Sequence, residues 1–174
     1  MSLPTEMTPR EREIIYGTLM GDAYIHVKWP EFNNISLMMT RQCAHREYMD
    51  WFMIELQRFD PTLRPQQYNR TTTTKYMGNH VRVQIPCDNK TESSLVLRTS
   101  TRTPIWKQLY DQFYSGERKK CHIPVEELTP LALAVLWQDD GTTNGSWYTY
   151  GRLNVQGFPL SERQILQQYL DEIS

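Results

Sequence analysis

The segment Leu128-Thr-Pro-Leu-Ala-Leu-Ala-Val-Leu-Trp-Gln-Asp-Asp-Gly141 decides how this chain of 174 residues folds. Its apolar run follows Thr129 and Pro130, which suit the N-cap and the first turn of a helix. The run ends on two acidic residues and a glycine. The segment therefore predicts a helix over 128–140 that ends on the carboxylate of Asp140.

A similar segment, Tyr16-Gly-Thr-Leu-Met-Gly-Asp-Ala-Tyr-Ile25, lies near the start of the chain. It closes a predicted helix over 7–21, in which Thr8 and the glutamate three residues later form a capping box. Both segments place small residues inside an apolar helix and an acid at its end. Small residues let two helix backbones approach closely. We therefore expect the two helices to pack side by side and to bring Asp22 and Asp140 together.

Two acidic helix ends that meet predict a site for a divalent cation. A carboxylate at a helix C-terminus lies against the negative end of the helix dipole, which is unfavourable unless a cation is present. Carboxylate and main-chain carbonyl oxygens are the hard ligands that Mg²⁺ and Ca²⁺ take. For a single segment, an acid exposed to water is the commoner arrangement. The second copy, followed by similar strands, favours the metal site.

Composition is that of an ordinary soluble globular chain, with 39% hydrophobic and 22% charged residues. No apolar run approaches the ~18 residues that cross a bilayer, and the polar start of the chain is unlike a signal peptide. The three cysteines, Cys43, Cys87 and Cys121, are widely spaced and lack zinc-site partners, which indicates a reducing compartment. We expect a cytoplasmic protein with no membrane contact, from a bacterium or phage in preference to an organelle.

Basic charge is concentrated in one contiguous third of the chain. The segment from Thr62 to Lys120 holds 11 Lys and Arg against 4 Asp and Glu, whereas the remainder holds 8 against 16. This asymmetry is typical of a surface that binds a polyanion, although a solvated basic face fits the charge equally well. The same third alternates polar and apolar residues, as half-buried strands do.

The predicted elements repeat the order helix, strands, helix, in full the first time and shortened the second time. Among the helices, the one over 46–59 offers apolar side chains, including Ile54, for burial. Gly116 is expected to end the helix over 104–114, and Ser161 is expected to cap the last helix. The predicted helices cover 7–21, 46–59, 104–114, 128–140 and 161–173, and the predicted strands cover 22–28, 35–42, 64–74, 80–85, 95–102 and 148–156.

In these motifs the chain resembles the LAGLIDADG homing endonucleases, particularly the monomeric kind with two repeats. Gly17-Thr-Leu-Met-Gly-Asp-Ala-Tyr-Ile25 is similar to the end of the family's first helix. Leu128–Gly141 is the more specific match, because the second motif often runs from a Leu-Thr-Pro stretch to Asp-Asp-Gly. The strand Arg152-Leu-Asn-Val-Gln-Gly-Phe158 also resembles the strand that comes after the second motif in that family. The resemblance covers nearly the whole chain from Ile14 on.

The resemblance implies an α+β fold of αββαββα repeats with an antiparallel sheet saddle that lies in the DNA major groove. Residues 1–120 would be the first repeat, with the DNA-reading strands. Residues 121–174 would be the start of a second repeat that is incomplete. We expect a second polypeptide, a second copy of this chain, or a disordered or removed tail to complete it, because the uncovered strand edge and apolar surface would otherwise be costly.

The implied activity is that of a site-specific endonuclease that cuts both strands of DNA with Mg²⁺ or Mn²⁺. Asp22 and Asp140 would ligate the metal, helped by the main-chain carbonyls of Gly21 and Asp139. The family also places a basic residue near each metal cluster, for which Lys120 is the candidate. An RNA-binding intron maturase and a DNA-binding relative without cleavage are the alternatives, and the presence of both acids favours the endonuclease.

Polar and basic residues on alternate strand positions suit contacts to base edges and phosphates. Each one alone is more often a solvated strand residue, and it is the group that predicts a DNA-reading surface. The predicted DNA-binding residues are Lys28, Arg64, Gln66, Arg70, Arg82, Gln84, Tyr150, Arg152 and Asn154.

Overall fold

The structure of the protein is a computed structural model. It describes residues 3–27, 35–66, 70–76, 79–85, 94–101, 103–116, 118–120, 124–144 and 150–173. The chain divides into two compact units, of which unit 1 comprises residues 1–37 with 100–174 and unit 2 comprises residues 38–99. These two units reflect which residues pack together and do not show where one sequence repeat ends. The predicted repeat boundary at residue 120 therefore stays a prediction.

Helix α1 (Pro9–Met20) opens unit 1 and begins as the sequence predicts. The Thr8 hydroxyl accepts from the amide of Glu11 at 3.2 Å, and the Glu11 carboxylate accepts from the amide of Thr8 at 2.7 Å. This is the expected capping box, which satisfies two of the donors that a helix N-terminus leaves free. Every residue from 14 to 20 is buried, so the helix lies within unit 1 and not on its surface.

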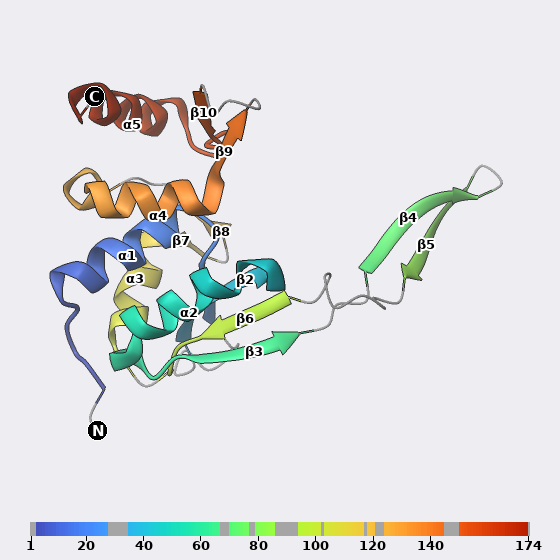
Figure 1. Ribbon diagram of the computed structural model, residues 1–174, viewed down its shortest axis with the longest axis horizontal. Helices are drawn as coiled ribbons and strands as arrows, with labels where there is room; N and C mark the ends of the chain where they lie inside the picture. Colours follow the sequence, from blue (N-terminus) through green and yellow to red (C-terminus); the bar gives the residue numbers. More distant parts are fainter. Residues whose placement is uncertain are drawn as a thin grey trace. The chain divides into compact units, whose positions relative to one another are not determined.

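Helix α4 (Pro130–Asp140) packs along α1, as predicted, and Figure 1 shows the two helices side by side. The Thr129 hydroxyl caps α4 by accepting from the amide of Ala132 at 3.2 Å. A Cβ on Gly17 would lie 2.6 Å from the Ala132 carbonyl oxygen and 2.8 Å from the Cβ of Val135. Only a glycine permits this approach of one helix backbone to the other.

Helix α3 (Ile105–Phe113), which also belongs to unit 1, packs against α1. The rings of Tyr16 and Phe113 meet edge to face at 5.5 Å, and the Tyr16 hydroxyl donates to Gln112 Oε1 at 2.7 Å. A hairpin of β7 (Tyr114–Ser115) and β8 (Arg118–Lys119) follows directly. Gly116 therefore does not end the helix as predicted; it lies at the hairpin turn with φ +60°, a conformation that favours glycine.

Unit 1 continues through η4 (Val125–Glu127) into α4 and then a two-stranded sheet. Strands β9 (Gly141–Asn144) and β10 (Tyr150–Leu153) pair antiparallel, where the sequence predicts one strand over 148–156. The last helix is α5 (Leu160–Ile173). Its first turn is closed by the Arg163 amide, which donates to the Pro159 carbonyl, so Ser161 lies inside the helix and the prediction that it caps the helix is wrong.

Unit 2 contains a sheet with a helix packed against it. Strand β2 (Ile35–Gln42) crosses from unit 1 into unit 2 and leads through η1 (Cys43–His45) into α2 (Arg46–Glu55) and η2 (Gln57–Phe59). Strands β3 (Thr62–Gln66), β4 (Arg70–Tyr76), β5 (Asn79–Ile85) and β6 (Ser94–Arg98) follow. With β1 (Tyr24–Val27), the four-stranded sheet has the order β1-β2-β6-β3, while β4 and β5 form a separate pair.

The core of unit 2 lies between α2 and one face of the sheet. Its fully buried side chains include Phe52 and Phe59 beside Leu97. The helix ends at Glu55, earlier than predicted, and Asp60 closes the following turn with φ 49°. Ile54 is 65% exposed, so the expectation that it is buried is wrong. None of the helices in the described ranges is long and apolar enough to span a membrane.

Gly17→Ala tests the close helix packing. Alanine favours a helix over glycine by about 1 kcal/mol. We nevertheless expect the substitution to lower the free energy of unfolding by roughly 1–3 kcal/mol, because the new methyl group overpacks against the α4 backbone. Urea titration followed by circular dichroism measures the change.

The control is Ala134→Gly, on the exposed side of α4. It should cost about 1 kcal/mol from helix propensity alone. A Gly17→Ala protein as stable as the wild type would show that the helices do not need this approach.

Candidate active site

The C-terminal ends of α1 and α4 meet through Gly21 and Asp139. A Cβ on Gly21 would lie 2.6 Å from the Cβ of Asp139 and 2.7 Å from its Oδ2. Gly21 and Asp139 each directly precede a candidate metal ligand, Asp22 and Asp140. The structure therefore joins two acidic helix ends that lie 118 positions apart in the sequence.

The carboxylate of Asp139 bridges the two helix ends. Its Oδ2 accepts from the Thr18 hydroxyl at 2.8 Å and from the Asp22 amide at 3.3 Å. Thr18 is fully buried, and Asp139 is half-buried. A hydrogen bond to a charged acceptor is stronger than one between neutral groups. Asp139 thus fixes the backbone from which Asp22 projects, a side-chain role that the sequence did not reveal.

Asp22 projects from the turn that ends α1. The Gly21 amide donates to the Gly17 carbonyl at 3.2 Å, and the Ala23 amide donates to the Thr18 carbonyl at 3.0 Å. Ala23 is buried whereas Asp22 is exposed, so the turn is anchored and its carboxylate meets solvent. This is the disposition that a ligand to a solvent-accessible metal needs.

Asp140 lies at the corresponding end of α4. Its carbonyl oxygen accepts from the Asn154 amide at 3.0 Å and from Asn154 Nδ2 at 2.8 Å. The Trp137 ring packs against Gly141 and Gly151, where a side chain would collide with it. These contacts hold the last turn of α4 against the β9–β10 sheet. The Asn154 side chain thus contacts the backbone of a candidate metal ligand. Its predicted role in reading DNA stays a prediction.

A lysine contacts the acidic end of α1. Lys119 Nζ donates to the carbonyl oxygens of Gly21 at 2.8 Å and Ala23 at 2.7 Å. The predicted basic residue was its neighbour Lys120, whose side chain is exposed and whose amide donates to the Phe113 carbonyl at 2.7 Å. A catalytic role for Lys120 stays a prediction. The structure adds Lys119, which the sequence analysis missed because successive residues of a strand point to opposite faces.

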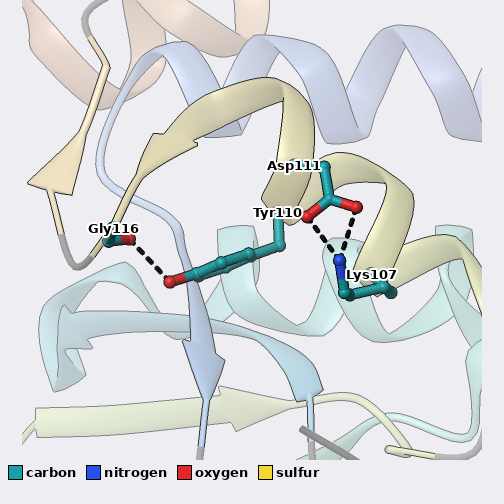
Figure 2. A network of polar contacts seen from close by, with 4 residues as sticks. All are labelled: Lys107, Tyr110, Asp111 and Gly116. Atoms are coloured by element: carbon teal, nitrogen blue, oxygen red, sulfur yellow. Dashed lines mark hydrogen bonds and ion pairs between the residues drawn. The ribbon is translucent and has the colours of Figure 1, made fainter.

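The hairpin that carries Lys119 is itself held at two points. The Tyr110 hydroxyl on α3 donates to the Gly116 carbonyl at 2.6 Å, as Figure 2 shows beside the Lys107–Asp111 ion pair. The Tyr114 hydroxyl accepts from the Ile25 amide at 2.9 Å. Burial raises the pKa of Tyr114, so this hydroxyl stays neutral in ordinary buffers.

The oxygen atoms at the joined helix ends fit a magnesium site built on few side chains. Within the described ranges, no group of three or more His, Cys, Asp and Glu is placed to hold a metal. Mg²⁺ is commonly held by one or two carboxylates together with waters and substrate phosphates. Asp22 and Asp140, with the carbonyl of Gly21, are donors of that kind.

The predicted DNA-binding residues are only partly described. Lys28 lies outside the described residues, as do the side chains of Gln66, Arg70, Arg82, Gln84 and Tyr150. Arg64 on β3 and Arg152 on β10 are both exposed. Their role in binding DNA stays a prediction.

The register of unit 2 groups further polar residues on one sheet face. Val96 pairs with Arg64 on one side and with Thr40 on the other, and Arg98 pairs with Thr62. Directly paired residues share a face, so Arg64 and Arg98 lie on the face away from the buried Leu97. Arg98 alternates with apolar neighbours in the sequence, and this pattern was the available signal for it.

The separate hairpin divides the predicted residues between two faces. Arg82 pairs with Thr73 and Gln84 with Thr71, whereas Arg70 pairs with Ile85. Because alternate positions share a face, the positions of Arg82 and Gln84 lie on one face and that of Arg70 on the other.

Sequence comparison decides the family. Residues 12–173 match the family model described as the LAGLIDADG DNA endonuclease family. The chain belongs to this family. The structure agrees with the α+β fold implied by the resemblance to LAGLIDADG homing endonucleases, with two acid-tipped helices packed together.

A solved LAGLIDADG structure is similar to this chain over most of its length. It is the homing endonuclease I-WcaI bound to its DNA recognition sequence, with 20% identity and a TM-score of 0.65. The match covers 94% of this chain and 66% of that one, so this chain spans about two thirds of that relative. A comparison with curated proteins finds no match.

Thr18→Val tests the bridge between the helix ends. Valine preserves the shape of threonine and removes the hydroxyl that donates to Asp139. We expect the free energy of unfolding to fall by about 1–3 kcal/mol, because a partly buried carboxylate loses a donor. Urea unfolding at neutral pH measures the loss.

Thr142→Val is the matched control, since Thr142 is exposed and its hydroxyl makes a bond of 3.4 Å to the Arg152 carbonyl. It should change stability by less than about 0.5 kcal/mol. Equal losses of stability in the two variants would contradict a bridging role for Asp139.

Proposed function

We propose that this chain is a site-specific DNA endonuclease, or a subunit of one, that hydrolyses phosphodiesters in both strands with Mg²⁺ or Mn²⁺. The observation that carries the proposal is the junction of α1 and α4, where Asp139 ties together the helix ends that bear Asp22 and Asp140. Membership of the LAGLIDADG DNA endonuclease family supports the same activity.

Asp22 and Asp140 would hold the divalent ion, with the carbonyls of Gly21 and Asp139 as further oxygen donors. When bound, such an ion supplies an activated water and stabilises the departing oxygen. The residues of the chain do the remaining work. Thr18 and Asp139 orient the turn before Asp22, and Asn154 orients the last turn of α4 before DNA arrives.

The outer face of the sheet in unit 2 would contact DNA. Arg64 and Arg98 share this face with Thr40 and Thr62, so basic groups for phosphates lie among groups that can bond to bases. A face that combines arginines with threonines suits contacts to base edges, in addition to contacts with the DNA phosphates. DNA bound to the solved I-WcaI structure supports the same substrate class.

A further polypeptide would cover α5, in this proposal either a second chain or a second copy of this one. Leu170 is 37% exposed and Ile173 is 51% exposed, and their spacing of three places both on one side of α5. Exposed apolar side chains on one helix are typical of a surface that a partner covers. The two-stranded β9–β10 sheet also leaves strand edges that another strand can join.

Leu170→Lys together with Ile173→Lys tests the role of the α5 surface. If copies of this chain cover it, the wild type should sediment as a dimer at micromolar concentration and the double variant as a monomer. Analytical ultracentrifugation measures the mass. Gln164→Lys with Gln168→Lys adds the same charge to another exposed side of α5 as a control. A wild-type monomer that cuts DNA at full rate by itself would contradict the need for any partner.

Asp22→Asn and Asp140→Asn test the metal site. A duplex selected by the wild type from a randomised library serves as substrate. We expect each variant to cut at least about 100-fold more slowly, because an amide is a weaker metal ligand. The Kd for the duplex should change by less than about threefold, since binding rests mainly on the basic surface.

Asp171→Asn, on the exposed side of α5, removes the same charge away from the junction and should cut normally. Undiminished cutting by Asp22→Asn would refute its role as a ligand. A structured RNA that displaces the selected duplex at lower concentration would instead favour the maturase alternative.

A further inference from the structure

The ammonium group of Lys119 lies at the C-terminal end of α1. It donates to the carbonyl oxygens of Gly21 and Ala23, which follow the last turn of α1. A helix C-terminus carries unsatisfied carbonyls and partial negative charge. Helix α1 has no basic residue in its own last turn, so the compensating charge comes from the β7–β8 hairpin.

The carboxylate of Asp139 adds negative charge at this end. Asp139 bonds to the Asp22 amide, and Asp140 is the next residue along α4. Like charges gathered at one place raise the free energy of the folded state unless a cation offsets them. Without a divalent ion, the junction needs a resident cation.

We propose that Lys119 is this resident cation, a positioning residue that holds the Gly21–Ala23 backbone so that Asp22 is in place before a metal binds. The proposal rests on the proposed metal role of Asp22. It also makes a distinct claim: without the Lys119 charge, the stability of the folded protein becomes dependent on divalent ions.

The fold holds Lys119 firmly enough for this role. The hairpin is fixed to α3 by the bond from Tyr110 to the Gly116 carbonyl, and its next residue is fixed by the bond from the Lys120 amide to the Phe113 carbonyl. The Tyr114 hydroxyl joins the same hairpin to β1 through Ile25. Lys119 is only half-exposed, so its charge is less screened by water than that of a free surface lysine.

The other half of the junction differs in charge. There, the Asp140 carbonyl accepts twice from Asn154, a neutral residue. The proposed resident charge therefore concerns the Asp22 side, and removing the Asn154 side chain should not create the same dependence on divalent ions.

The test compares thermal unfolding of the full chain in EDTA and in MgCl₂ at equal ionic strength. In EDTA, Lys119→Met should lower the Tm by roughly 4–8 °C. MgCl₂ should restore at least half of that loss, while the wild type gains little. Lys119→Gln, which keeps hydrogen-bond donors without the charge, should respond to MgCl₂ as Lys119→Met does, and Lys119→Arg should behave as the wild type does.

Lys107→Met is the matched control, because it removes a lysine from an exposed ion pair with Asp111 on α3. Its Tm should fall by no more than about 2 °C and should not depend on MgCl₂. Asn154→Ala should show no recovery specific to MgCl₂.

An unchanged Tm of Lys119→Met in EDTA would overturn the proposal, and so would a loss that NaCl restores as well as MgCl₂ does. If Lys119→Met does not fold, the comparison of Lys119→Gln with Lys119→Arg decides in the same way. Adding Asp22→Asn to Lys119→Met should abolish the recovery. Cutting by Asp22→Asn alone would refute the proposed function and leave the loss of stability in EDTA standing, so the two failures are distinguishable.

Discussion

The contact of Gly17 with the backbone of α4 is the constraint on which the rest of the junction depends. A Cβ there would lie 2.6 Å from the Ala132 carbonyl oxygen, so the two helix axes are as close as backbone atoms allow. Moving α4 outward by the width of a methyl group would separate Thr18 from Asp139 and break a bond of 2.8 Å. The polar junction is therefore set by apolar packing one turn away. Because interiors are close-packed, such a displacement cannot be absorbed locally.

The junction separates the groups that hold the backbone from the groups that face solvent. Thr18 is fully buried and Asp139 half-buried, and both are used in contacts between the helices. Asp22 is exposed, one residue beyond the glycine that lets the helix ends meet. The proposed ligand and the residues that support it thus have different surroundings. This arrangement keeps the carboxylate in a fixed place at low cost, since its charge stays hydrated.

The helices could be predicted from the sequence and the lysine contact could not, for a physical reason. The capping box at Thr8 and the cap at Thr129 are local, and each depends on residues within one turn. Lys119, by contrast, reaches Gly21 only because the β7–β8 hairpin has a particular register and turn. A shift of one residue would present Lys120 instead. Strand β9 was missed for a related reason, because its run of glycine, threonine and asparagine gains strand structure from pairing with β10 and not from its own pattern.

The two halves of the junction resemble each other in sequence and differ in their supports. Each helix ends on an acid followed by a small residue, yet the carbonyls after α1 are held by the charged Lys119 and the carbonyl of Asp140 by the neutral Asn154. Opposite charges interact more strongly in a partly buried site than in water. The backbone contact is therefore made by a charged group after α1 and by a neutral group at the end of α4. If the two carboxylates hold an ion as proposed, they do so from helix ends whose backbones are held by different chemistry.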